Sequence, residues 1–133
     1  MRAYLRNDIE AASPSRILEM LLMGAMRFMD EAERDYQEQR TLQARQTVSR
    51  AADIVTELSA TLRTDLAPDL AAALLPIYDF VIRRLLHSVL HDDAVALSEA
   101  KKTFEVIAEA FLQALEKAQV DHQAAQAAQA AAE

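Results

Sequence analysis

The sequence lacks cysteine and tryptophan altogether, and it has only one glycine and three prolines among 133 residues. Without cysteine, the chain has neither a disulfide framework nor a thiolate metal site, which fits a reducing compartment. A single glycine excludes a glycine-rich loop that cradles phosphate. Because glycine and proline are the residues that most often interrupt helices, their scarcity predicts long helices.

Positive charge is also scarce: the chain has 14 basic and 21 acidic residues, and its net charge is −7. A nucleic-acid-binding domain needs a basic surface, so we expect no nucleic acid partner. Charged residues interrupt every apolar stretch before it reaches the length of a membrane span, and no signal peptide is recognisable. The sequence therefore predicts a cytoplasmic protein without membrane insertion.

Apolar residues are abundant, at 52% of the chain, and they recur at helical spacing. Four amphipathic helices joined by short loops predict an all-α fold, an antiparallel up-down four-helix bundle. We expect one domain over 1–119, which begins with a mobile N-terminal arm over 1–12. The low-complexity Ala/Gln tail over 120–133 is expected to fray. The predicted helices span 14–37, 42–63, 68–90 and the residues after the His-Asp-Asp turn at 91–93.

Local signals predict where these helices begin. Ser13 is a good N-cap, and Pro14 suits the first helical position. Thr41 is the predicted N-cap of the second helix, and Asp65 or Ala67 that of the third. Pro76 lies inside the third helix, where it predicts a kink or a break after a short first piece.

The first and third predicted helices have more apolar surface than one core-facing stripe requires. In the third helix, a second stripe includes Leu75, Tyr78, Ile82 and Leu86, and it is predicted either to bind a partner or to join the core. In the first helix, Met23 falls on the polar strip. Gly24 either lowers helix stability without a compensating role or marks a point where another backbone approaches closely. The predicted core stripe of the first helix is Leu18, Leu21, Ala25, Phe28, Ala32 and Tyr36, widened by Ile17, Met20, Met26 and Met29. The other predicted seams are Val48, Ala51, Val55, Leu58 and Leu62 in the second helix and Leu97, Ala100, Phe104, Ile107, Phe111, Ala114 and Ala118 in the fourth.

Catalytic signals are weak, so we expect no enzyme activity and no cofactor. His87 and His91 are four residues apart, a spacing that metal sites use, but cationic side chains at a helix C-terminus explain them more simply. Asp79 and Arg83, also four apart, are predicted to form a surface ion pair.

Three segments carry a specific resemblance to a known family: "AYLRNDIEAASPSRILEMLLMGAMRF", "AADIVTELSATL" and "LLPIYDFVIRRLLHSVL". The combination of Ala-Ser-Pro, Gly-Ala-x-Arg-Phe and Tyr-Asp-Phe-x-x-Arg-Arg-Leu resembles the flagellin export chaperone family, FliS. The resemblance covers about residues 3–115. The chain departs from the family at Leu22-Met23, where Tyr-Asp is usual, and at Phe111, where the family often has tryptophan.

The resemblance implies a four-helix bundle that binds the disordered C-terminal segment of flagellin in the cytoplasm, prevents premature polymerisation and delivers the subunit to the flagellar type III export apparatus. It also implies that residues 1–12 cover the apolar groove when no client is bound, with Tyr4 and Ile9 as anchors. The export gate and a flagellar regulator or co-chaperone are further candidate partners.

Helix-in-groove recognition requires an exposed apolar stripe. We therefore predict that the second stripe of the third helix, extended by a residue beside the seam of the second helix, forms the client-binding groove. The alternative is a structural or adaptor homo-oligomer without a flagellin client, in which copies of the bundle bury the surplus apolar faces. A monomer or weak dimer is expected from the chaperone interpretation. The predicted groove residues are Ile54, Leu75, Tyr78, Ile82 and Leu86.

Overall fold

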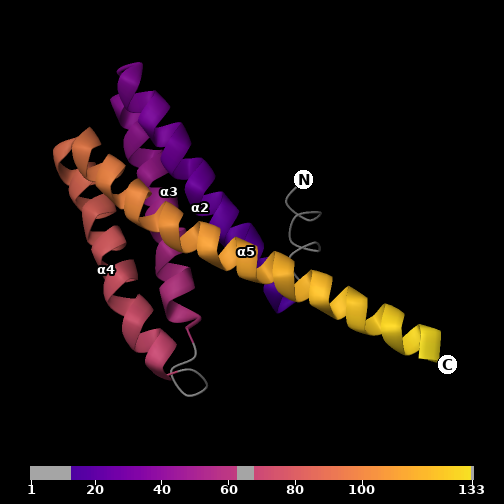
Figure 1. Ribbon diagram of the computed structural model, residues 1–133. Helices are drawn as coiled ribbons and strands as arrows, with labels where there is room; N and C mark the ends of the chain where they lie inside the picture. Colours follow the sequence, from indigo (N-terminus) through magenta and orange to yellow (C-terminus); the bar gives the residue numbers. More distant parts are fainter. Residues whose placement is uncertain (1–12, 63–67, 133) are drawn as a thin grey trace.

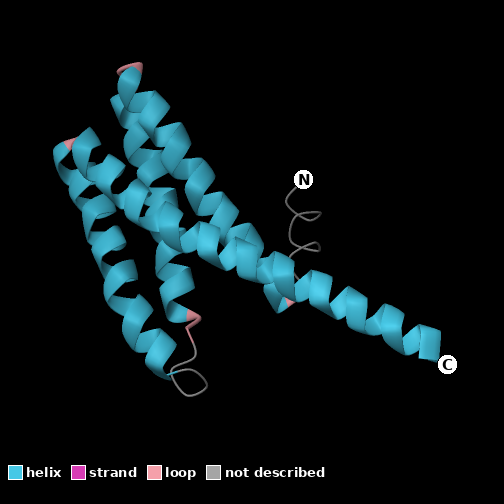
Figure 2. Cartoon of the chain, in the orientation of Figure 1, coloured by secondary structure: helices cyan, strands magenta, loops and turns pink. Residues whose placement is uncertain are grey.

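The structure, a computed structural model, describes residues 13–62 and 68–132 and is helical almost throughout (Figures 1 and 2). Each helix packs against its neighbours in the chain, and the last also packs against the first, so the four helices close a ring. This arrangement is the predicted antiparallel up-down bundle, and the described residues contain no strand. The helices are α2 (Pro14–Gln37), α3 (Thr41–Ala60), α4 (Pro68–His91) and α5 (Ala94–Ala132).

The first helix begins as the sequence predicts, but the second is capped differently. The Ser13 side chain accepts a hydrogen bond from the Arg16 backbone N–H at 3.2 Å, and Pro14 opens α2. Thr41 is the first residue of α3 and not its N-cap, which is Arg40. The turn is made one residue earlier than predicted, and Gln39 within it has a left-handed conformation, with φ at 60°. The predicted N-caps of the third helix, Asp65 and Ala67, lie outside the described residues.

The turn between α4 and α5 is held by two neighbouring carboxylates, as the His-Asp-Asp sequence predicts. The Asp93 side chain accepts hydrogen bonds from the backbone N–H groups of Ala96 at 3.1 Å and Val95 at 3.0 Å, and these bonds lower the pKa of its carboxyl. Asp92 has a φ of 51°, and its carboxylate accepts two hydrogen bonds from Arg45 of α3, which lower its pKa. The two carboxylates therefore cap α5 and tie the turn to α3.

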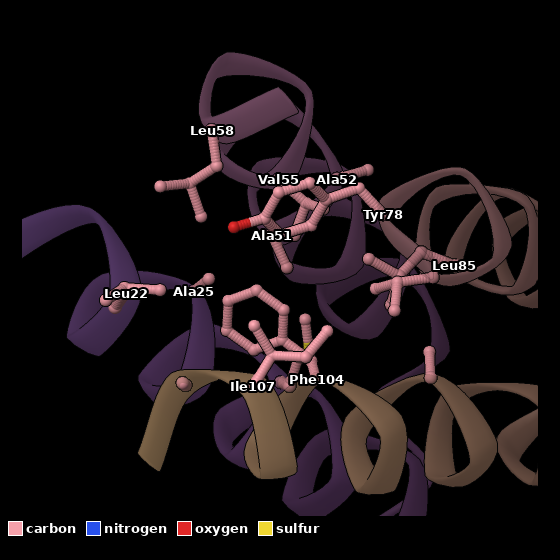
Figure 3. Close-up of a cluster of buried hydrophobic side chains, with 14 of the residues drawn as sticks. Leu22, Ala25, Ala51, Ala52, Val55, Leu58, Tyr78, Leu85, Phe104 and Ile107 are labelled. Carbon is pink, nitrogen blue, oxygen red and sulfur yellow. The ribbon is translucent and has the colours of Figure 1, made fainter. Parts of the chain in front are cut away.

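Side chains from all four helices meet in one core (Figure 3). The buried residues of α3 and of the first half of α5 match the predicted seams, except that Leu62, just past the end of α3, is only partly buried. In α2, Ala25, Met29 and Ala32 are buried as predicted, and Leu18, Leu21 and Phe28 pack against the core but stay partly exposed. Leu22, which was not predicted, is fully buried. The buried stripes include Leu22, Ala25, Met29 and Ala32 of α2, Val48, Ala51, Val55 and Leu58 of α3, Leu74, Tyr78, Val81 and Leu85 of α4, and Leu97, Ala100, Phe104 and Ile107 of α5.

The last helix extends far beyond the bundle (Figure 1). Phe111 is partly buried, whereas Ala114 and Ala118, which were predicted to continue the seam, are exposed, as is every residue from 120 to 132. The tail was expected to fray, but in the structure it is helical to Ala132. Alanine and glutamine favour helix, and a helix already nucleated in the bundle needs no new nucleus to propagate. The division into a domain over 1–119 and a separate tail stays a prediction.

Two further expectations concern α4 and the N-terminal arm. The helix α4 runs without a break through Pro76, so the expected short first piece is not found. The N-terminal arm, with Tyr4 and Ile9, lies outside the described residues. Across 13–62 and 68–132, no helix is long and apolar enough to cross a bilayer.

Candidate functional site

The structure separates the five predicted groove residues into three groups. Tyr78 is 1% exposed and belongs to the core, where it lies on the buried side of α4 with Leu74, Val81 and Leu85. The burial also raises the pKa of its hydroxyl. Ile54 lies on the flank of α3 that faces α2, since its Cδ1 atom would stand 3.5 Å from a Cβ placed on Gly24. Tyr78 is therefore no surface residue, and Ile54 does not extend the same face.

The other three residues share one flank of α4. Leu75, Ile82 and Leu86 are spaced by seven and four residues, which places them on one side of the helix. Arg84 lies on the opposite flank, where its Nε atom is 3.2 Å from a carboxylate oxygen of Glu99 in α5. Because α4 packs chiefly between α3 and α5, the flank turned away from α5 faces α3. The structure thus brings these three side chains together, while their role in binding stays a prediction.

The apolar flank of α4 extends further along the helix than the groove predicted from the sequence. Leu90 continues it by one more turn and is 78% exposed, and Leu86 is 48% exposed. Ile82 is partly buried and packs against the core, so it anchors the flank to the bundle. The four-residue spacing from Leu86 to Leu90 could have identified the extra residue. We call Leu75, Ile82, Leu86 and Leu90 the α4 stripe.

Beyond Arg45, the side of α3 that faces the α4 stripe carries small residues. Arg45 contacts Asp92 at the α4–α5 turn, and Ser49, Ala52 and Thr56 follow it at helical spacing on the same flank. The Ser49 hydroxyl donates a hydrogen bond to the Arg45 carbonyl at 2.9 Å, and the Thr56 hydroxyl donates to the Ala52 carbonyl at 2.8 Å. Since both hydroxyl donors are already satisfied within α3, a partner can cover this side without leaving them unpaired.

A recess lies between the start of α2 and the second half of α5. It is a cleft of about 1040 Å³. Met23 lines it and is 53% exposed, in agreement with its predicted place on the polar strip. None of the predicted groove residues reaches this cleft. Its lining is mixed in character, with Ser13, Ser15, Arg16, Glu19 and Met23 from the start of α2 and Leu112, Leu115, Glu116, Ala118, Gln119 and His122 from α5.

The cleft opens beyond the point where an ion-pair cluster fixes α5 to α2. The Lys101 ammonium lies 2.7 Å from an Asp30 carboxylate oxygen and 3.1 Å from one of Glu33. The hydrogen bond to Asp30 is the largest cause of a raised pKa at Lys101. The first half of α5 is therefore held against α2 by charge as well as by apolar packing.

The two histidines near the end of α4 have a structural explanation. The imidazole centroids of His87 and His91 are 4.4 Å apart, and His87 Nε2 is 3.3 Å from a carboxylate oxygen of Asp93. Within the described part of the chain, no group of three or more His, Cys, Asp or Glu residues is arranged to hold a metal ion. His87 thus contacts a carboxylate at the C-terminal end of α4.

Comparisons with known proteins agree with each other. A family model described as flagellar protein FliS matches residues 1–118. The flagellar secretion chaperone FliS of Salmonella typhimurium is 35% identical over 124 residues, which cover 89% of this chain and 91% of the relative. The protein of the same name from Bacillus subtilis is 25% identical over 119 residues, with 90% and 88% covered. A solved structure titled as a flagellar chaperone from bacteria shares the fold, with a TM-score of 0.69 at 18% identity over 88% of this chain and 98% of that one.

Proposed function

Because this chain belongs to the flagellar protein FliS family, we propose that it is an export chaperone that binds the disordered C-terminal segment of flagellin. It holds the segment in the cytoplasm, prevents premature polymerisation and delivers the subunit to the flagellar type III export apparatus. This function is one of binding alone, so it needs no catalytic residue and no cofactor. The export gate and a flagellar regulator or co-chaperone are candidate partners at later steps.

The observation that carries the proposal is an exposed apolar surface on a well-packed bundle of this family. The α4 stripe supplies anchors at i, i+7, i+11 and i+15, which is the pattern that an amphipathic client helix can match. The side chains of α3 beside it, Ser49, Ala52 and Thr56, are small. The α4 stripe spans sixteen residues, or about 22 Å between its end residues, which corresponds to roughly four turns of a client helix.

Binding of this kind prevents assembly by mass action. A disordered segment that folds on the chaperone pays an ordering cost, which burial of apolar surface has to exceed. While the segment is held, it is not free to join another flagellin. In the absence of client, we propose that residues 1–12 cover the same surface, with Tyr4 and Ile9 as anchors.

The proposal is tested with a synthetic peptide that spans the C-terminal segment of a flagellin. Isothermal titration calorimetry is expected to detect binding at micromolar concentrations. At a peptide concentration of about one hundred times Kd, the bound protein should gain about 2.7 kcal/mol in stability, which a thermal melt records. No heat of binding and no thermal shift at tens of micromolar would contradict the proposed function.

A homo-oligomer is the second candidate, and the exposure of Leu86 and Leu90 is the observation in its favour. In that case the same stripe would be buried by a second copy of the chain. Size-exclusion chromatography with light scattering separates the two candidates. We expect a monomer or a weak, concentration-dependent dimer, whereas a tight dimer that persists on dilution would favour the oligomer.

A further inference from the structure

One charged residue interrupts the α4 stripe. Asp79 stands four residues after Leu75 and three before Ile82, which places it on the same flank of α4. Its side chain is 56% exposed, and one carboxylate oxygen lies 3.0 Å from Nε of Arg83. Arg83 is 77% exposed and lies further toward solvent. An otherwise apolar surface thus carries a hydrated carboxylate between two of its anchors.

A partner that covers the α4 stripe must remove water from this carboxylate. Dehydrating a charge is costly unless hydrogen bonds replace the lost water. The contact with Arg83 engages a single oxygen of Asp79, Oδ2. An apolar client residue at this level would leave the other oxygen, Oδ1, without a donor once water is excluded.

Two hydroxyls of the neighbouring helix, those of Ser49 and Thr56, do not provide the replacement. On the flank of α3 that faces α4, the hydroxyl of Thr56 donates to its own backbone, as does that of Ser49. Ala52, between them, has no polar side-chain atom. A donor from the partner would satisfy the second carboxylate oxygen directly.

We propose that Asp79 is a specificity-determining residue, which selects a client helix with a lysine or arginine between its apolar anchors. The basic side chain donates a hydrogen bond to Asp79, while the anchors on either side of it pack against Leu75 and Ile82. A charge-assisted bond of this kind offsets the dehydration of the carboxylate. It also disfavours helices that are apolar along the whole face, because they leave the carboxylate unpaired. The inference rests on the proposed function, since it describes how that client is chosen.

A double-mutant cycle tests this assignment. The probe is the same flagellin peptide, together with variants in which each lysine or arginine is replaced in turn by alanine. Each peptide is titrated into the wild-type protein, into Asp79→Asn and into the control Glu109→Gln, which changes an exposed carboxylate on α5. Asp79→Asn keeps the size of the side chain at an exposed site, so circular dichroism should show an unchanged fold.

At one basic position of the peptide, we expect replacement by alanine to weaken binding to the wild type by roughly threefold to tenfold. The same replacement should change binding to Asp79→Asn by less than about twofold, and binding to the control as in the wild type. Higher salt should also weaken the wild type more than Asp79→Asn. If the wild type binds the peptide but no basic position couples to Asp79, the specificity role is wrong and the proposed function stands. If the wild type does not bind at all, both are wrong.

Discussion

Gly24 is the only glycine of the chain, and replacing it with alanine should stabilise the protein. The residue is buried in the interior of α2, and its φ is not positive. A Cβ atom at this position would meet Cδ1 of Ile54 at 3.5 Å, which is an ordinary van der Waals distance. The close approach that the sequence suggested is therefore to a side chain, and there is room for one methyl group.

The expected gain follows from two contributions. Alanine in a helix interior is about 0.8 to 1.0 kcal/mol more favourable than glycine. The new methyl group is buried against Ile54, which adds up to about 0.8 kcal/mol. We therefore expect Gly24→Ala to raise the free energy of unfolding by about 1 to 1.5 kcal/mol. For a domain of this size, the melting temperature should rise by about 3 to 8 °C.

Thermal and urea denaturation followed by circular dichroism measure this change. The matched control is Ala25→Gly, the reverse exchange at the next residue, which is fully buried. It should lower stability by about 1 to 2 kcal/mol, because it loses both helix propensity and a buried methyl group. A melting temperature of Gly24→Ala below that of the wild type would refute the reasoning, since it would mean that Ile54 cannot accommodate the added atom.

Three further predictions follow from contacts in the bundle. Lys101→Met removes the ion pairs that join α5 to α2, and it should lower stability by about 1 kcal/mol in urea titrations, less at high salt. The pKa values of Asp92 and Asp93 are lowered in the folded state. The two carboxylates therefore contribute to the free energy of unfolding above their unfolded pKa of about 4, and this contribution is lost as the pH falls through the lower folded pKa. The melting temperature should therefore fall from pH 6 to pH 2.5, and less steeply in Asp92→Asn. Tyr78→Ala should cost about 3 to 5 kcal/mol by denaturation, as expected for a core residue, and a loss below 1 kcal/mol would contradict its burial.

Much of the fold could be predicted from the sequence, because its signals are local. Ser13 caps a helix with its own side chain, and Pro14 suits the first helical position. The helix that carries Val48, Ala51 and Val55 has only one apolar side, so its buried side is evident from the sequence. The start of α3 was displaced because the backbone N–H of Arg40 donates to the Asp35 carbonyl at 2.8 Å and its guanidinium contacts the Asp35 carboxylate. This contact between Arg40 and Asp35 forms only when the turn itself has formed. The residue preferences of N-cap positions therefore do not predict it.

The candidate site was harder to predict, because it lies on helices with two apolar stripes. In α4, the spacing of apolar residues is compatible with Tyr78 in the core or at the surface. Tyr78 is buried because α4 packs against both α3 and α5. In α2, apolar residues occur on nearly every side, so Leu22 was missed. Which stripe is buried depends on where the neighbouring helices lie, and periodicity within one helix does not contain that information.

If the α4 stripe binds the client, a charge placed on it must weaken binding, and two matched variants examine this. Leu86→Asp places a charge on the stripe, whereas Val106→Asp places one at an exposed apolar residue of α5, away from the stripe. Since both residues are exposed, 48% and 71% respectively, both variants should keep the fold. Calorimetry with the flagellin peptide should show binding to Leu86→Asp weakened by at least about tenfold. Binding to Val106→Asp should stay within about twofold of the wild type, and equal affinities for the two variants would contradict the account.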